Sequence, residues 1–261
     1  MVTLDVNGVS LAAYESGTGD PPFVFIHGFA CDHTFWVPQF DDLARDHRCL
    51  SLDLRGRGGS EAKPPYHTTQ QADDVAAVMR ALGFGPSIIV GHSLGGIVAL
   101  LLNERHPDLV LGIVTGDSPI NAKGLGAGGM VKAIREAGGI EPARPLVERF
   151  WSETTSDAIK AHVREVMLDI PAEVAAGMLD EAPDDRMADL MKLADKKPLM
   201  AIWAEGALGE PLWLREVAMY IRQEVVPGTG HFFQLEEPGM TNALLRAFLD
   251  DVARDPRIVR A

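Results

Sequence analysis

The stretch Ile88–Gly96 reads IIVGHSLGG and joins a short apolar run to the start of an apolar helix. It matches the pattern G-x-S-x-G, in which a serine lies at a sharp turn between a strand and a helix. Such a turn pushes the side chain of Ser93 out of the edge of a sheet. Gly91 and Gly95 remove side chains that would collide across the turn, and the N–H of Leu94 begins the helix where an oxyanion would form. Ser93 is therefore the predicted nucleophile, with the Leu94 N–H as an oxyanion donor.

Short apolar runs alternate with helical patterns along most of the chain. Asn7-Gly8 stands between strand-like residues and predicts a tight hairpin turn near the start. The later apolar runs predict buried strands at 23–26, 49–54, 87–90, 109–115, 199–204 and 223–226. Helical periodicity falls at 35–44, 68–82, 94–105, 212–220 and 238–252. This alternation predicts an α/β fold, with a mainly parallel sheet and helices on both faces.

The alternation stops after Pro119, and helical patterns with no convincing strand continue to about residue 195. We interpret residues 120–195 as a helical lid, inserted into a single α/β core formed by residues 1–119 and 196–261. The lid contains Trp151, a candidate for contact with substrate, and several methionines. These methionines either form a flexible apolar ceiling for a substrate or pack the core of the insertion itself.

Composition restricts the classes of protein that the chain can belong to. Its 261 residues suit one domain, and 24 basic against 37 acidic side chains give a formal charge of −13. That charge argues against a nucleic-acid partner, because phosphate contacts are made chiefly by Lys and Arg. No apolar stretch is long enough to span a membrane, and two cysteines provide no disulfide framework. We expect a cytoplasmic protein with a small-molecule substrate and, because nucleotide-binding and metal motifs are absent, no cofactor and no metal.

A serine hydroxyl needs a neighbouring base to act as a nucleophile at neutral pH. Among eight histidines, His231 stands out because it follows a late apolar strand on the glycine-flanked loop Gly228–His231. His92 adjoins the nucleophile, and it either lines the pocket or orients the turn. His231 is the predicted general base, and His92 and Cys31 are candidates for contact with substrate.

These motifs together resemble the α/β-hydrolase superfamily. The resemblance is carried by His27–Phe29 after a strand, by DLRGRGGS at 53–60, by the turn at Ser93 and by the loop before His231. It implies an eight-stranded, mostly parallel sheet flanked by helices, with the active site at the carboxyl ends of the strands. The order of Ser93 before His231 is also the order of that superfamily's triad.

The same resemblance implies roles for residues near the oxyanion loop. The Phe29 N–H becomes the second oxyanion donor, and His27 is expected to tie the loop down by hydrogen bonds. Asp53 and Arg55 are expected to belong to the scaffold, as a local ion pair that holds a tight turn.

The acid of the triad is where this sequence departs from the resemblance. Members of the superfamily usually place an aspartate just after the strand that follows the insertion, and here Ala207 occupies that position. Two carboxylates remain as candidates. Asp117 ends the strand before the insertion, as in certain dehalogenases and lactone hydrolases of the superfamily, and Glu205 ends the strand after it. We favour Asp117, although an aspartate before Pro119 also suits a simple turn cap.

Acyl transfer to water is the plainest reaction for these residues. The resemblance implies a serine hydrolase of the carboxylesterase or lactonase type, acting on a small, largely apolar substrate. A different enzyme class remains open, because Asp117 and His33, which follows Cys31-Asp32, partly resemble cofactor-independent dioxygenases that cleave 3-hydroxy-4-quinolones. A third alternative is a slow or non-catalytic ligand sensor, because fold alone does not determine function.

Overall fold

The N-terminal hairpin forms one edge of the sheet in this computed structural model, which describes residues 1–121, 127–180 and 186–256. Strands β1 (Val2–Val6) and β2 (Val9–Ser16) pair in antiparallel register. The connecting residues Asn7 and Gly8 have φ angles of 51° and 73°. Positive values at both positions are those of a type I′ turn, which asparagine and glycine tolerate. The predicted hairpin is confirmed.

The other strands of the sheet run parallel to one another. The sheet has eight strands in the order β1-β2-β4-β3-β5-β6-β7-β8, and β5 lies between β3 and β6. The parallel strands are β3 (Phe23–Ile26), β4 (Cys49–Leu52), β5 (Ser87–His92), β6 (Val110–Gly116), β7 (Leu199–Ala204) and β8 (Arg222–Val226). Because parallel strands end at the same edge, residues that follow β3, β5, β6 and β7 gather there. The predicted eight-stranded, mostly parallel sheet is confirmed.

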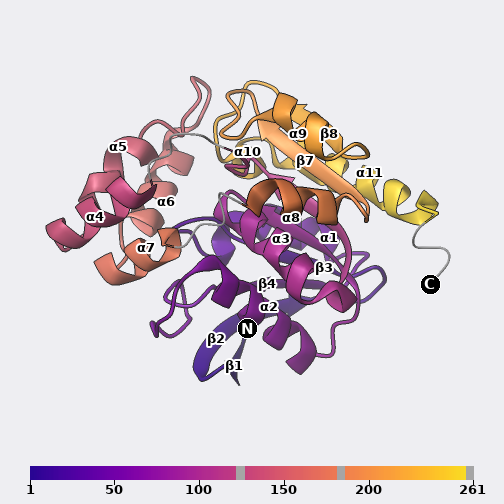
Figure 1. The fold of residues 1–261 in the computed structure, drawn as a ribbon, viewed down its shortest axis with the longest axis horizontal. Helices are drawn as coiled ribbons and strands as arrows, with labels where there is room; N and C mark the ends of the chain where they lie inside the picture. The colour runs from indigo at the N-terminus through magenta and orange to yellow at the C-terminus, as the bar shows by residue number, and fades with distance from the viewer. Residues whose placement is uncertain (122–126, 181–185, 257–261) are drawn as a thin grey trace.

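Helices cover both faces of this sheet (Figure 1). Alternate residues of β5 show the division, since Ile89 belongs to one buried apolar cluster and Ile88 and Val90 to the other. The first face is covered by α2 (Thr68–Ala81), α3 (Leu94–Arg105) and α8 (Met187–Ala194), and the second by α1 (Val37–Leu43) and α11 (Pro238–Arg254). Short helices complete the chain: η1 (His33–Trp36), η2 (Pro107–Leu109), α9 (Pro211–Val217) and α10 (Phe233–Glu236).

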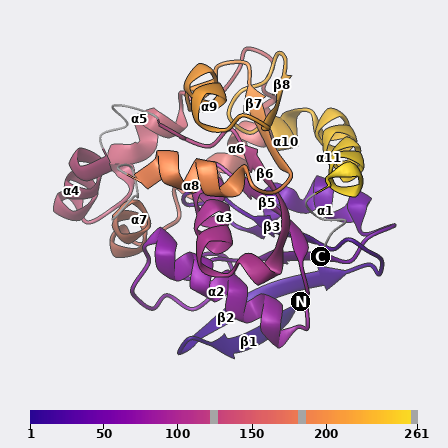
Figure 2. The same ribbon diagram turned by 45° about the vertical axis from the view of Figure 1, so that its right-hand side comes forward.

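Helices of the insertion form a group beside the sheet. They are α4 (Ala127–Ala137), η3 (Glu141–Ala143), α5 (Arg144–Val147), α6 (Asp157–Met167) and α7 (Ala172–Leu179). Figure 1 shows this group at the left of the molecule, and Figure 2 shows α4, α5 and α7 there, whereas α8 lies along α3. The described residues of the insertion contain no strand. The sequence of the insertion has a glycine-rich stretch at 124–129, and part of it lies outside the described residues.

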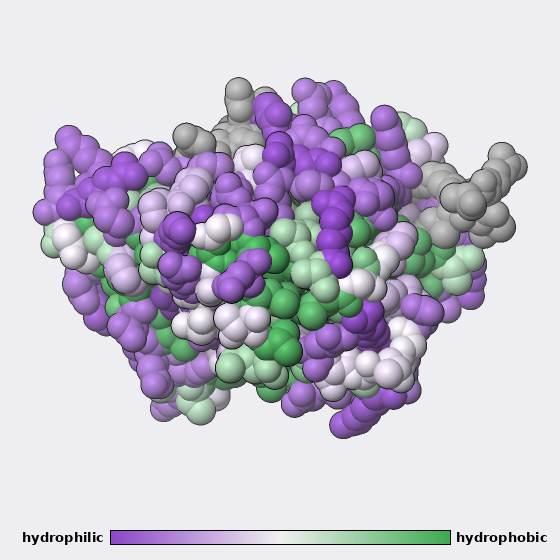
Figure 3. Space-filling view, turned by 90° about the horizontal axis from the view of Figure 1, so that it is seen from below, coloured by the Kyte–Doolittle hydropathy of each residue, from purple (hydrophilic) through white to green (hydrophobic). Residues whose placement is uncertain are grey.

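The face shown in Figure 3 is mainly hydrophilic, with an apolar area at its centre. None of the helices in the described ranges has both the length and the apolar character that crossing a membrane requires. Cys31 and Cys49 are buried free thiols. In the described part of the chain, no three His, Cys, Asp or Glu side chains are grouped as metal ligands would be.

Candidate active site

Ser93 lies in a strained turn between β5 and α3. Its φ and ψ angles are 52° and −121°, a region that costs a residue other than glycine about 1–3 kcal/mol. Main-chain hydrogen bonds hold it there, from the Ser93 N–H to the Gly116 carbonyl (2.7 Å) and from the Gly96 N–H to the Ser93 carbonyl (3.0 Å). This is the strand–turn–helix context that the sequence pattern predicts for a nucleophilic serine.

Two glycines allow the chain to turn so sharply. A Cβ atom on Gly91 would overlap the backbone of Gly95, which is the collision across the turn that the sequence predicts. A Cβ atom on Gly95 would instead overlap the carbonyl oxygens of Ile26 and His27, at the end of β3. Gly95 therefore also brings the turn against the loop that follows β3.

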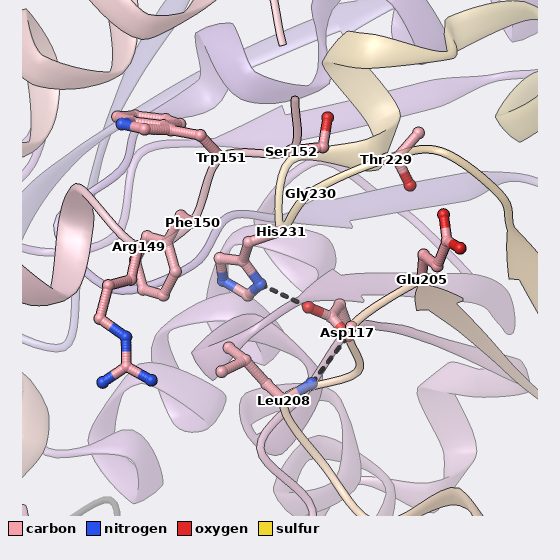
Figure 4. Close-up of a pocket in the computed structure, with 11 residues that line it drawn as sticks. Asp117, Arg149, Phe150, Trp151, Ser152, Glu205, Leu208, Thr229, Gly230 and His231 are labelled. Carbon is pink, nitrogen blue, oxygen red and sulfur yellow. Dashed lines mark hydrogen bonds and ion pairs between the residues drawn. The ribbon is translucent and has the colours of Figure 1, made fainter. Parts of the chain in front are cut away.

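His231 and Asp117 form a buried hydrogen-bonded pair (Figure 4). The distance from His231 Nδ1 to Asp117 Oδ2 is 2.7 Å, and the two side chains are 4% and 1% exposed. The other carboxylate oxygen accepts the Leu208 N–H at 3.1 Å. Because a carboxylate only accepts, Nδ1 carries the proton and Nε2 is left as a proton acceptor. The pair therefore has the tautomer that a general base requires.

Glu205, the other candidate acid, has a different partner. Its Oε2 accepts the backbone N–H of Gly228 at 2.7 Å, and the residue is exposed. In Figure 4 its carboxylate is turned away from the imidazole of His231. Of the two carboxylates at the end of β6 and β7, Asp117 is thus the one in contact with the histidine.

The hydroxyl of Ser93 makes no hydrogen bond to the described residues, so the structure joins the histidine to Asp117 but not to the serine. Ser93 and His231 are nevertheless near one another. His92, which directly precedes the serine, donates from its Nε2 to the His231 carbonyl at 2.8 Å. The rings of these two histidines lie 4.5 Å apart. Bonds between a nucleophile and its base are often long without substrate and tighten when the substrate binds.

His92 and Cys31, the two candidates for contact with substrate, are both packed inside the protein. Both side chains are fully buried, and His92 packs between Trp36, His231 and Phe232. Burial lowers the pKa of His92 well below its usual value and raises that of Cys31. Their contacts help to orient the backbone of the site, and the assignment of both to substrate binding stays a prediction.

The loop after β3 lies directly against the serine turn. A Cβ atom on Gly28 would come within 3.0 Å of the Ser93 Cβ, so the main chain that carries Phe29 passes beside the nucleophile. His27 holds this loop, since its Nε2 accepts the Leu54 N–H at 3.0 Å and its Nδ1 contacts the Gly28 carbonyl at 2.9 Å. Burial lowers the pKa of His27 to about 4, so the ring is neutral. The loop and the first turn of α3 place the main chain of Phe29 and Leu94 beside the same serine.

The expected ion pair between Asp53 and Arg55 does not form. Arg55 instead contacts Asp74 of α2 through two hydrogen bonds of 2.6 and 2.8 Å. Asp53 accepts from the side chain and backbone N–H of His33 and from the Gly59 N–H. Burial alone would raise the pKa of Asp53, but these hydrogen bonds outweigh it and lower the pKa. Asp53 and Arg55 thus hold parts of the scaffold together, and the His33 side chain is hydrogen-bonded to Asp53.

A cavity of about 270 Å³ lies beside the His231–Asp117 pair. Trp151, Glu205, Arg149 and Phe150 line it. In Figure 4 the ring of Phe150 lies beside the imidazole, whereas the indole of Trp151 and the carboxylate of Glu205 point away from it. Sequence reasoning singled out Trp151 but missed Arg149 and Phe150. Their only sequence signal is that they precede Trp151 in the insertion.

The chain belongs to the Alpha/beta hydrolase family, whose sequence profile it matches over residues 23–244. It is 27% identical to the 2-(acetamidomethylene)succinate hydrolase of Mesorhizobium japonicum, covering 95% of this chain and 94% of that one. Among solved structures it is similar to a malate-bound thermophilic esterase from Thermogutta terrifontis (TM-score 0.85, 25% identity, covering 96% and 98% of the two chains). It is also similar to Est816, described as an N-acyl homoserine lactone degrading enzyme (TM-score 0.80, 27% identity, 95% and 100%). The chain is therefore an enzyme of the α/β-hydrolase class.

Proposed function

We propose that the chain is a serine hydrolase that cleaves a carboxylic ester or lactone of a small, largely apolar substrate through an acyl-enzyme. The observation that carries this proposal is the buried Asp117–His231 hydrogen bond of 2.7 Å beside the strained turn of Ser93. An esterase and a lactone-degrading enzyme among the similar structures support the same bond type.

In the first half of the reaction, the Ser93 hydroxyl attacks the carbonyl carbon while Nε2 of His231 takes its proton. Asp117 holds the imidazole in the required tautomer and stabilises the imidazolium that forms. The N–H groups of Phe29 and Leu94 bind the oxyanion, and the first turn of α3 adds its positive dipole end. The imidazolium then gives its proton to the departing alkoxide, and the acyl group remains on Ser93.

In the second half, a water molecule replaces the alcohol. His231 takes a proton from this water as it attacks the acyl carbonyl, and the same two N–H groups hold the second oxyanion. Collapse of the intermediate returns the proton to Ser93 and releases the acid. The cycle consumes only substrate and water.

The insertion is assigned the role of a lid in this proposal. Trp151 and Phe150 lie on the stretch that joins α5 to α6, and they form an aromatic wall of the cavity beside His231. Leu208 adds an aliphatic side chain to the lining. The lining also includes the polar side chains of Arg149, Ser152 and Glu205, and Ser93 is not part of it. This cavity of about 270 Å³ therefore bears on the part of a small substrate that extends beyond His231.

A parallel rate assay tests the proposal, with short-chain p-nitrophenyl esters and with a 3-hydroxy-4-quinolone in an oxygen electrode. We expect ester turnover without oxygen uptake, and loss of that turnover in Ser93→Ala. A Ser93→Ala rate within about tenfold of wild type would remove the acyl-enzyme mechanism. Oxygen uptake that survives the loss of Ser93 but not of His231 would establish the dioxygenase alternative. Absence of both activities would favour a hydrolase of narrow specificity or a ligand sensor.

A further inference from the structure

Arg57 is a buried cation whose hydrogen bonds all go to main-chain carbonyl groups. The residue is 5% exposed, and none of the direct ion pairs within the described ranges includes it, although Asp32, Asp53 and Asp169 are near enough to act on its charge. Its Nε donates to the Cys31 carbonyl (3.1 Å), its Nη1 to that of Asp169 (3.1 Å) and its Nη2 to that of Val166 (2.8 Å). Burial of a charge is costly unless hydrogen bonds compensate for it, and these three carbonyl groups provide that compensation.

Two of these carbonyls lie at or just beyond the end of lid helix α6. Val166 lies in its last turn, and Asp169 lies just beyond its C-cap residue Leu168. The last carbonyls of a helix have no partner within the helix and carry the negative end of its dipole. Arg57 satisfies one of them, that of Val166, with a charged donor from the core, and it also binds the carbonyl of Asp169 just beyond the helix. A second contact, between Thr34 Oγ1 and His162 Nε2 at 3.0 Å, ties the same helix to the segment after β3.

The third carbonyl belongs to the turn that carries the proposed oxyanion donor. The Cys31 N–H donates to the Gly28 carbonyl at 3.2 Å and closes a turn over residues 28–31. Within that turn Ala30 has a φ angle of 56°, which is costly for a residue other than glycine. The turn needs outside contacts to persist, and Arg57 supplies one at its carboxyl end.

We propose that Arg57 is a positioning residue that fixes the turn 28–31 to lid helix α6, so that the place of the lid sets the place of the Phe29 N–H. This inference rests on the proposed function, in which that N–H binds the oxyanion. A planar guanidinium suits the task, because its donors diverge toward three acceptors, whereas the ammonium of a lysine is a single point charge. Binding of substrate that positions the lid would thereby also position the Phe29 N–H.

The test compares Arg57→Met and Arg57→Lys with Arg135→Met. Arg135 is a suitable control because it is a lid arginine that pairs with Asp180 at 2.9 Å on the surface, away from the turn. A displacement of about 1 Å at a reacting centre costs on the order of 100-fold in rate, so we expect Arg57→Met to lower kcat by about 30- to 100-fold. KM should change by less than about threefold, and Arg57→Lys should lose about tenfold in kcat. Arg135→Met should stay within about twofold of wild type in both constants.

A second measurement distinguishes positioning of the oxyanion donor from a purely structural role. It is the affinity for a boronic acid, which forms a tetrahedral adduct on the serine. In Arg57→Met the affinity for the boronic acid should fall by the same factor as kcat. The affinity for the product carboxylic acid should stay almost as in wild type. Millimolar guanidinium should restore part of the kcat of Arg57→Ala. Equal weakening of both ligands, wild-type kcat in Arg57→Lys, or an equal loss in Arg135→Met would overturn the inference. Persistence of ester turnover in Ser93→Ala would instead remove the proposed function on which it rests.

Discussion

The backbone N–H of His231 donates a hydrogen bond of 2.8 Å to the carbonyl of Phe150, and the rings of the two residues lie 4.4 Å apart. The insertion and the loop that carries the proposed base are thus joined through the main chain. Glu236 strengthens the junction, because its carboxylate accepts the Gly230 N–H at 3.1 Å and the Thr155 hydroxyl at 2.7 Å. The position of His231 therefore depends on a segment about 80 residues earlier in the chain.

Glu236→Gln should weaken this junction. A glutamine amide replaces one acceptor oxygen with a donor that faces other donors, so we expect a loss of about 1–2 kcal/mol in stability. The same change should lower kcat about tenfold through displacement of His231. Glu237→Gln is the matched control, because Glu237 is the exposed neighbour. Urea unfolding and ester turnover measured on both variants check this, and equal effects at the two positions would contradict it.

Asp117→Asn and Glu205→Gln separate the two candidate acids. Loss of the corresponding charge in a protease triad lowers kcat by roughly 10⁴ through the wrong histidine tautomer, so we expect a loss of that order in Asp117→Asn. Glu205→Gln should remain within about threefold of wild type, because its carboxylate contacts Gly228. Steady-state hydrolysis of a p-nitrophenyl ester measures both. The assignment is wrong if Glu205→Gln is the crippled variant.

Ser93→Gly and Ser93→Ala should both abolish turnover but differ in stability. The φ angle of 52° at this position strains alanine as it strains serine, whereas glycine adopts it freely. We expect Ser93→Gly to be more stable than Ser93→Ala by about 1 kcal/mol in urea unfolding. A glycine variant of lower stability than the alanine variant would show that the turn is not strained.

Gly95→Ala should destabilise the fold, because its Cβ would overlap the carbonyls of Ile26 and His27. Overpacking of this kind costs about 1–3 kcal/mol, and here backbone would have to move. Gly239→Ala is the control, since a Cβ at that helix position in α11 meets nothing within 4 Å. We expect the control to be neutral or slightly stabilising. Thermal unfolding of the two variants measures the difference.

Stability should fall on acidification because of the buried histidines. Burial lowers the folded-state pKa of His27 to about 4, below its usual value of 6.5. Between these values the unfolded chain binds a proton that the folded chain does not, so the free energy of unfolding falls as pH drops through this window. The slope is about 1.4 kcal/mol per pH unit for each such histidine, and the contribution is constant above pH 6.5. His92 acts in the same direction.

Urea unfolding between pH 7 and pH 4.5 checks this dependence. We expect His27→Gln to show a shallower decline than wild type, because glutamine does not titrate. Parallel curves for wild type and His27→Gln would contradict the prediction.

Much of the fold could be predicted because its signals are local. The tight turn at Asn7-Gly8 depends on the φ angles that these two residues tolerate, and both angles are positive in the structure. The turn at Ser93 depends on glycines within three residues of it. The alternation of Ile88, Ile89 and Val90 between the two faces of the sheet likewise follows from the period of a strand.

The partners of charged side chains could not be predicted in the same way. Asp53 and Arg55 are two residues apart, yet their side chains pair with His33 and Asp74 instead of with each other. Successive side chains along a chain point in different directions, so the partner is decided by whichever element packs against each. The contacts of Arg57 with a helix more than a hundred residues later depend on packing in the same way.

The sequence by itself determined the alternating α/β architecture and the strained serine turn, because both depend on residues close together in the chain. Only the tertiary structure decided which carboxylate contacts His231. Asp117 and Glu205 both end parallel strands at the same edge of the sheet, so sequence position brings both near the histidine. A hydrogen bond from the Leu208 N–H holds the carboxylate of Asp117 toward the imidazole. A hydrogen bond from the Gly228 N–H holds the carboxylate of Glu205 away from it.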